Sequence, residues 1–127
     1  MLSKEEALRA YAAMINTVDI NKLEPFLAGD FHYASQWFYE EFQTKQAYLD
    51  YMTPKLVNIK ASGFKVWAEM GYTTYGNIGP CVVIAQLFKD DLVGVVLVEV
   101  EGEKIKRLDM CFIPDPQTAN RFGEYPK

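Results

Sequence analysis

The stretch CVVIAQLFKDDLVGVVLVEVEGEKIKRLDMCFI, residues 81–113, decides the fold. It contains three runs of strand-like composition, 81–88, 92–101 and 104–113, separated near Asp90-Asp91 and Glu101-Gly102. Short polar or glycine-containing pairs between such runs are typical of β-hairpin turns. The stretch therefore predicts three consecutive antiparallel strands.

The residues before this stretch are mostly helical in pattern. Ser3-Lys4-Glu5-Glu6 has the sequence of a capping box and begins a predicted helix over 3–17. A short helix over 20–27 and a long one from Thr44 to Ser62-Gly63 follow. Strands are expected at 30–35, 37–40 and 64–70, a long loop or irregular strand end at 71–80, and a C-terminal tail at 114–127. Helices first and strands last predict a single α+β domain over 1–127.

Composition excludes several classes of protein. The net charge is −4 and the isoelectric point is near 5.0, with no concentration of Lys and Arg, which argues against nucleic-acid binding. The longest apolar run, 92–98, is far shorter than the roughly 20 residues of a membrane-spanning helix. The N-terminus has acidic residues where a signal peptide would be apolar. We therefore expect a soluble, cytoplasmic protein with no membrane association.

The two hairpins predict which side chains share a face. Two-residue turns would place Val96 opposite both Ala85 and Arg107. One face would then carry small apolar residues together with Arg107 and Asp109. The other face would carry large apolar residues, which favours burial against a second subunit. That set is Val82, Ile84, Gln86, Phe88, Val93, Val95, Leu97, Glu99, Lys104, Lys106, Leu108, Met110 and Phe112.

Arg107 and Asp109 form the sharpest pair of candidate site residues. Charges on an apolar face must be paired or solvated, because an isolated buried charge is costly. The pair could be a structural salt bridge. Alternatively, Arg107 could hold the carboxylate or another anionic group of a ligand, with Asp109 orienting it or acting as a base.

Three segments resemble the nuclear transport factor 2-like superfamily, which includes ketosteroid isomerases and polyketide cyclases. They are YAAMINTVDINKLEPFLAGDFHY (11–33), TKQAYLDYM (44–52) and IKRLDMCF (105–112). The resemblance implies a cone-shaped roll in which three N-terminal helices pack on a curved antiparallel sheet around an apolar pocket. It also implies a homodimer formed through the convex face of the sheet.

The resemblance carries only part of the ketosteroid isomerase machinery. Tyr11 matches the tyrosine of the first helix by its spacing to Gly29-Asp30. The position of the general base falls at Ser35, which does not take a proton from carbon at neutral pH, and the position of the acid in the sheet falls at apolar residues 95–97. We therefore expect no steroid isomerase chemistry, and Tyr11 is either a catalytic residue or a core tyrosine.

The stretch FHYASQWFYEEF, residues 31–42, holds six of the eighteen aromatic residues and the only histidine. The resemblance directs Phe31, Tyr33 and Ser35 towards the pocket and His32 away from it. Trp37 is a further candidate for the pocket wall. Such a wall fits a flat apolar ligand, and it equally fits a filled cone without a ligand.

Two functions remain open. The first is a small-molecule pocket protein for an apolar or aromatic ligand with a polar or anionic group, with or without lyase, isomerase or hydrolase chemistry. The second is a non-catalytic protein-interaction module, of an inhibitor or immunity type, that acts through its sheet or its acidic surface. A pocket well above about 300 Å³ reached by Arg107 would favour the first. With one histidine and no carboxylate cluster, neither a metal nor another cofactor is expected.

Overall fold

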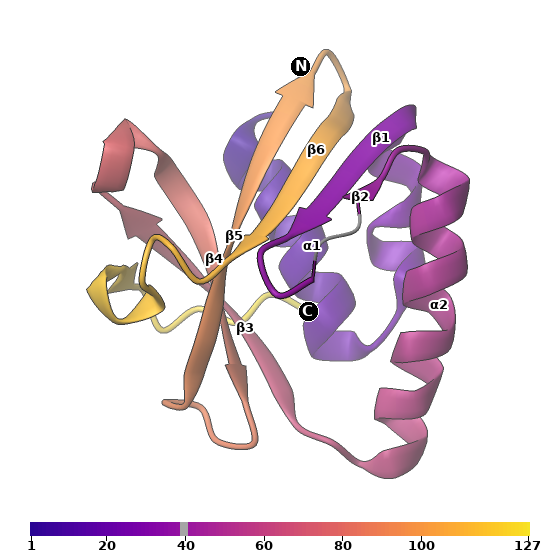
Figure 1. The fold of residues 1–127 in the computed structure, drawn as a ribbon. Helices are drawn as coiled ribbons and strands as arrows, with labels where there is room; N and C mark the ends of the chain where they lie inside the picture. The colour runs from indigo at the N-terminus through magenta and orange to yellow at the C-terminus, as the bar shows by residue number, and fades with distance from the viewer. Residues whose placement is uncertain (39–40) are drawn as a thin grey trace.

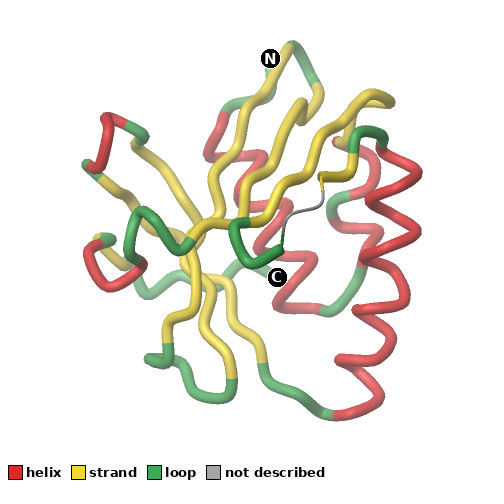
Figure 2. The backbone as a smooth tube through the Cα atoms, in the orientation of Figure 1, coloured by secondary structure: helices red, strands yellow, loops and turns green. Residues whose placement is uncertain are grey.

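A computed structural model describes residues 1–38 and 41–127 of the chain. Two α-helices lie on one side of a curved sheet, with shorter 3₁₀ turns between the elements (Figures 1 and 2). The helices are α1 (Lys4–Thr17) and α2 (Lys45–Ser62), and the 3₁₀ turns are η1 (Ile20–Lys22), η2 (Glu24–Phe26), η3 (Tyr75–Asn77) and η4 (Pro116–Thr118). The strands are β1 (Leu27–Ser35), β2 (Glu41–Phe42), β3 (Val66–Thr73), β4 (Gly79–Gln86), β5 (Leu92–Glu101), β6 (Lys104–Cys111) and β7 (Asn120–Arg121). The predicted α+β class is confirmed.

Local sequence signals explain where the two helices begin and end. Ser3 and Glu6 form the predicted capping box at the start of α1, and the Thr44 hydroxyl accepts the backbone N–H of Ala47 at the start of α2. α2 ends at Gly63, which adopts the left-handed conformation with φ of 70°. No helix among residues 1–38 and 41–127 is long and apolar enough to cross a membrane.

Two of the shorter predicted elements differ from the structure. The helix expected over 20–27 consists of the separate 3₁₀ turns η1 and η2, since Pro25 cannot donate the backbone hydrogen bond that a continuing α-helix needs. Of the strand expected over 37–40, Trp37 and Phe38 lie in a turn and a bend, so that part is wrong, and Tyr39 and Glu40 lie outside the described residues. The short strand β2 follows them at Glu41–Phe42.

The described part of the sheet has the strand order β2-β1-β6-β5-β4-β3-β7. All neighbouring strands are antiparallel except β1 and β6, which run parallel. The long strands β3 to β6 form the predicted meander, and β1 joins its far side. β3 extends to Thr73 and β4 begins at Gly79, so half of segment 71–80, expected as a long loop or an irregular strand end, is paired strand.

The main core lies between the two helices and the inner face of the sheet. Leu8, Tyr11 and Met14 of α1 and Tyr48 of α2 are almost fully buried there. The sheet contributes buried residues from each of its long strands: Leu27, Phe31, Tyr33, Ala68, Met70, Val82, Ile84, Val96, Val98, Ile105 and Leu108. The curved sheet therefore wraps one face around α1 and α2.

The register predicted for the two hairpins is wrong, and the cause is the same in both. Val96 lies opposite Val82 and Met110, and not opposite Ala85 and Arg107. Next to each turn, the observed pairing is displaced from the predicted pairing by an even number of residues, which alone would leave the faces unchanged. Farther from each turn the register shifts again, between Ile84 and Ala85 in one hairpin and between Glu99 and Val100 in the other. The total displacement is then odd, which inverts the faces of β4 and β6 relative to β5.

This inversion moves Arg107 and Asp109 to the outer face, so their predicted place on the inner face is wrong. Arg107 lies opposite Glu99 on β5 and beside His32 on β1. Its guanidinium donates two hydrogen bonds of 2.9 Å to the carboxylate of Asp109, and both side chains are about 30 % exposed (30 % and 29 %). The pair is a surface salt bridge on the side of the sheet away from the helices.

The outer face has its own small apolar cluster. Cys81, Val83 and Val95 are buried there, beneath the C-terminal segment that contains Ala119. Figure 1 shows the turn η4 of this segment on the side of the sheet opposite α2. Of the large apolar residues that suggested a dimer, Val82, Ile84, Leu108 and Met110 face the helices, while Val95 and Leu97 belong to the outer cluster, so the homodimer stays a prediction without its original argument.

Candidate functional site

Two adjoining cavities lie between α1, α2 and the inner face of the sheet. The outer one measures about 290 Å³ and the inner one about 140 Å³. Both are lined by Tyr33, Lys55, Gln86 and Met110, so they are two parts of one hollow. The outer part is also lined by Ser35, Trp37, Phe38, Tyr51 and Val93, and the inner part by Tyr11, Ile15, Met52, Ile59, Phe64, Val66 and Ile84. We refer to the two parts together as the central cavity.

The spacing of residues along each strand or helix determines which side chains point into the central cavity. Tyr33 and Ser35 are two residues apart on β1 and therefore point to the same side of the sheet. Tyr51 and Lys55 are four residues apart on α2, so they lie one turn apart on the same side of the helix. Tyr11 projects from the middle of α1. Two helices and the sheet therefore each contribute to the lining.

Aromatic rings form one wall of the central cavity. The ring of Tyr51 lies 6.2 Å from that of Tyr33, 5.9 Å from that of Phe38 and 4.8 Å from that of Phe42, measured between centroids. Trp37 is 59 % exposed at the rim and packs against Phe112 at 5.0 Å. Such a wall offers a large contact area to a planar apolar molecule.

Lys55 is the charged residue among the described residues that line the central cavity. Its Nζ donates a hydrogen bond of 3.0 Å to the hydroxyl of Tyr51 and lies 5.2 Å from the centre of the Tyr51 ring. Gln86 and the hydroxyl of Ser35 add polar groups to the same lining, and that hydroxyl accepts the backbone N–H of Trp37 at 3.1 Å. The mouth therefore combines a cation with apolar walls.

Tyr11 and Tyr33 of the central cavity are hydrogen-bond donors and not bases. Burial raises the pKa of Tyr11 and of Tyr33 well above the ordinary value, so both hydroxyls keep their protons at neutral pH. The described residues of the lining include no carboxylate, histidine or cysteine. The arrangement can bind and orient a polar group, and it offers no ready base for general acid–base catalysis.

The predicted site residues separate into two groups. The structure brings Tyr11, Tyr33, Ser35 and Trp37 together around the central cavity. Phe31 points to the same side of the sheet but is fully buried in the core and does not line the cavity, and Arg107 and Asp109 lie on the outer face. A catalytic role for Asp109 and a ligand role for Arg107 therefore lose their geometric basis.

Sequence reasoning missed Lys55, although a signal for it was present. In the helix predicted to begin at Thr44, Met52 and Ile59 are apolar residues at helical spacing, and Lys55 is three residues after the first and four before the second. A lysine at that spacing sits at the border of an apolar face, where its alkyl chain can be covered while its ammonium group reaches water.

Tyr48 lies beneath the central cavity and has a polar atom without a recorded partner. Its ring is fully buried and contacts Phe31 and Tyr33, with centroids 5.1 Å away in both cases. Its hydroxyl is buried and makes no hydrogen bond to any described residue. A buried hydroxyl without a partner carries the full cost of its lost hydration.

We therefore predict that Tyr48→Phe raises the free energy of unfolding by about 1 kcal/mol, because the variant removes only the hydroxyl. Tyr51→Phe on the same helix is the matched control. It removes a hydroxyl that accepts a hydrogen bond from Lys55, so it should be neutral or slightly destabilising. Urea unfolding of both variants measures the difference, and a clear loss of stability in Tyr48→Phe would contradict the assignment.

Solved structures of other proteins superpose on this architecture. A nuclear transport factor 2-like (NTF2-like) protein of unknown function from Cytophaga hutchinsonii superposes with a TM-score of 0.61 at 12% identity, over 90% of this chain and 95% of that one. The chain has the nuclear transport factor 2-like fold. An uncharacterised cystatin-fold protein from Novosphingobium aromaticivorans gives 0.61 at 15% identity, over 87% and 99% of the two chains.

A third structural neighbour was solved with a small molecule. It is a protein with a ketosteroid isomerase-like fold from Catenulispora acidiphila, in complex with trimethylamine. It superposes with a TM-score of 0.56 at 16% identity, over 86% of each chain. No protein-family model matches the present chain, and no curated protein matches its sequence. The expected fold is thus confirmed by shape alone.

Proposed function

We propose that the protein binds a small molecule in the central cavity. The ligand has an aromatic or apolar body that packs against Tyr33 and Tyr51, and an anionic or polar group that lies near Lys55. The observation that carries this proposal is the composition of the lining, which joins an aromatic wall to one cation and several neutral polar groups. Lys55 takes the place that Arg107 had in the sequence-based hypothesis.

The size of the cavity supports a small ligand. Ligand sites in proteins measure about 300 to 1,000 Å³, and the outer part alone is close to the lower limit. The inner part extends it towards Tyr11, so a single aromatic ring with a short chain would fit better than a steroid-sized molecule. The complex of one structural neighbour with trimethylamine supports the general point that this fold accepts small molecules.

The chemistry of the lining favours ligand binding without a catalysed reaction. The lining offers protonated tyrosines, Lys55 and an amide, which together can orient a carboxylate or a carbonyl group. The protein-interaction module remains the alternative from the sequence. The buried state of the outer apolar cluster beneath the C-terminal segment gives it no added support.

Lys55→Met tests the role assigned to the cation. Cinnamate and cinnamyl alcohol share a ring and a chain and differ in charge, so calorimetric titration with both separates the apolar and ionic parts of binding. We expect cinnamate to bind more tightly than the alcohol, and Lys55→Met to weaken cinnamate about tenfold, as the loss of one charge-assisted hydrogen bond implies. The affinity for the alcohol should change little.

Lys60→Met is the matched control, because Lys60 is another exposed lysine of α2 and does not line the central cavity. It should bind cinnamate as the unchanged protein does. Equal affinity of Lys55→Met and the unchanged protein for cinnamate would refute the role of Lys55. Failure of both probes to bind would favour the interaction module.

A further inference from the structure

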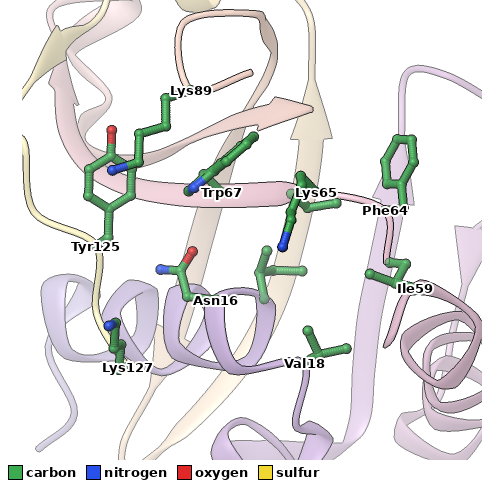
Figure 3. Close-up of a pocket in the computed structure, with 11 residues that line it drawn as sticks. Asn16, Val18, Ile59, Phe64, Lys65, Trp67, Lys89, Tyr125 and Lys127 are labelled. Atoms are coloured by element: carbon green, nitrogen blue, oxygen red, sulfur yellow. The ribbon is translucent and has the colours of Figure 1, made fainter. Parts of the chain in front are cut away.

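A second hollow adjoins the inner part of the central cavity, where the end of α1, the start of β3, the β4–β5 hairpin and the C-terminal segment meet. It measures about 420 Å³. Figure 3 shows Lys65 just before β3 and Trp67 on it, Asn16 and Val18 near the end of α1, Lys89 on the hairpin, and Tyr125 and Lys127 on the C-terminal segment. Its remaining lining residues are apolar and also line the inner part of the central cavity: Ile15, Ile59, Phe64 and Val66. We call it the lysine groove.

The walls of the lysine groove are held in place by hydrogen bonds. The amide of Asn16 donates to the backbone oxygens of Ala68 and Pro126 and accepts the N–H of Ala68, each at 2.8 Å. These bonds tie α1, the edge of β3 and the C-terminal segment together. Because the side-chain amide of Asn16 is hydrogen-bonded within the protein, its role is structural, and a ligand would contact other residues of the groove.

The charged side chains in the described lining of the lysine groove are all positive. Its described lining holds three lysines, Lys65, Lys89 and Lys127, and no acidic side chain. No ion pair joins any of them to a residue of the described chain. On the adjoining elements, Glu69 and Asp90 are paired with Arg121, and Glu124 is paired with Arg9. A protein of net charge −4 thus carries a local positive site here.

Aromatic rings accompany these cations. The Nζ of Lys89 lies 4.7 Å from the centre of the Tyr125 ring, which keeps this ammonium group beside an aromatic surface. Trp67 and Tyr125 are both half-buried in the lining. The N–H and C=O of Val66 also point outward, because those of Ala68 and Met70 do so along the same edge of β3. The described residues supply no partner for them.

We propose that the lysine groove is a second binding site, for an aromatic ring that bears an anionic group, either a carboxylate or a phosphate. The ring lies against Trp67 and Tyr125, and the anion is reached by Lys65 and Lys89. The volume falls within the range of small-ligand sites, and lysine is a common partner of phosphate and carboxylate. This site does not depend on the function proposed for the central cavity.

The two tryptophans allow the two sites to be read separately, because Trp37 lines the central cavity and Trp67 lines the lysine groove. In Trp37→Phe protein, titration with phenyl phosphate should give a saturable change in Trp67 emission, and added salt should weaken it. Benzoate tests the carboxylate in the same way, and phenol tests the uncharged ring. Binding of either anion supports the proposal, and the one that binds identifies the anionic group.

Adding Lys65→Met and Lys89→Met to this protein should weaken the response at least about tenfold. Adding Lys60→Met should not change it, since Lys60 lies outside the groove. Thermal unfolding of each variant checks that the exposed substitutions leave the fold intact. The proposal is overturned if neither anion gives a saturable response, if phenol matches the anions, or if the response survives the loss of both lysines. A response seen only from Trp37, in Trp67→Phe protein, also overturns it.

Discussion

Phe31→Ala is expected to cost about 4 kcal/mol of stability, one of the two largest losses predicted for this protein. The ring of Phe31 is fully buried and meets the ring of Tyr48 edge-on, with centroids 5.1 Å apart and an angle of 71° between the planes. Truncation removes that contact and leaves a void between β1 and α2. Because natural domains have only about 5 to 15 kcal/mol of stability, the variant should unfold at a much lower urea concentration.

Trp37→Ala is the control for this prediction. Trp37 belongs to the same aromatic stretch but is 59 % exposed, so its truncation should cost at most about 1 kcal/mol. Urea unfolding of the two variants therefore separates the core from the cavity rim. A loss in Phe31→Ala no larger than that in Trp37→Ala would contradict the core assignment and restore Phe31 as a residue of the pocket wall.

Arg121→Met is expected to cost about 3 kcal/mol, because it leaves a buried carboxylate without its counter-ion. Glu69 is only 4% exposed and accepts hydrogen bonds of 2.7 Å from the Nε of Arg121 and from the backbone N–H of Gly123. These contacts fasten the C-terminal segment over the outer apolar cluster. Their loss should free that segment, which limited proteolysis would detect.

Arg9→Met is the matched control, since Arg9 also binds the C-terminal segment through Glu124. That pair is exposed, so its loss should cost less than about 1 kcal/mol. The double variant Glu69→Leu with Arg121→Met removes both charges and should be more stable than Arg121→Met alone. If the double variant is as unstable as the single one, the cost does not come from the unpaired carboxylate.

Much of the fold follows from local signals in the sequence. The capping box at Ser3, the Thr44 cap and the stop at Gly63 define α1 and α2, because each supplies a hydrogen bond or a backbone angle that a helix end requires. Alternation along β1 places Phe31, Tyr33 and Ser35 on the inner face, as expected. These elements depend on residues that are close in sequence.

The sequence did not predict which faces of β4 and β6 are buried, because the strands of the meander do not alternate clearly between apolar and polar residues. Residues 81–85 and 92–98 are apolar at almost every position, so either face could be buried. Register then depends on turn length and on the shifts after Ile84 and Glu99, which no local pattern marks. The covering of the outer face by the C-terminal segment is likewise a long-range effect, fixed by Glu69 and Arg121.

The central claim is that the central cavity binds a small molecule, and native mass spectrometry of the purified protein tests it most directly. The control is Val93→Phe, which adds bulk to the lining of the outer part at a position that is already partly buried. We predict that the unchanged protein carries a discrete additional mass of a small organic molecule and that Val93→Phe does not. A bare unchanged protein, or the same additional mass on both proteins, would contradict the account.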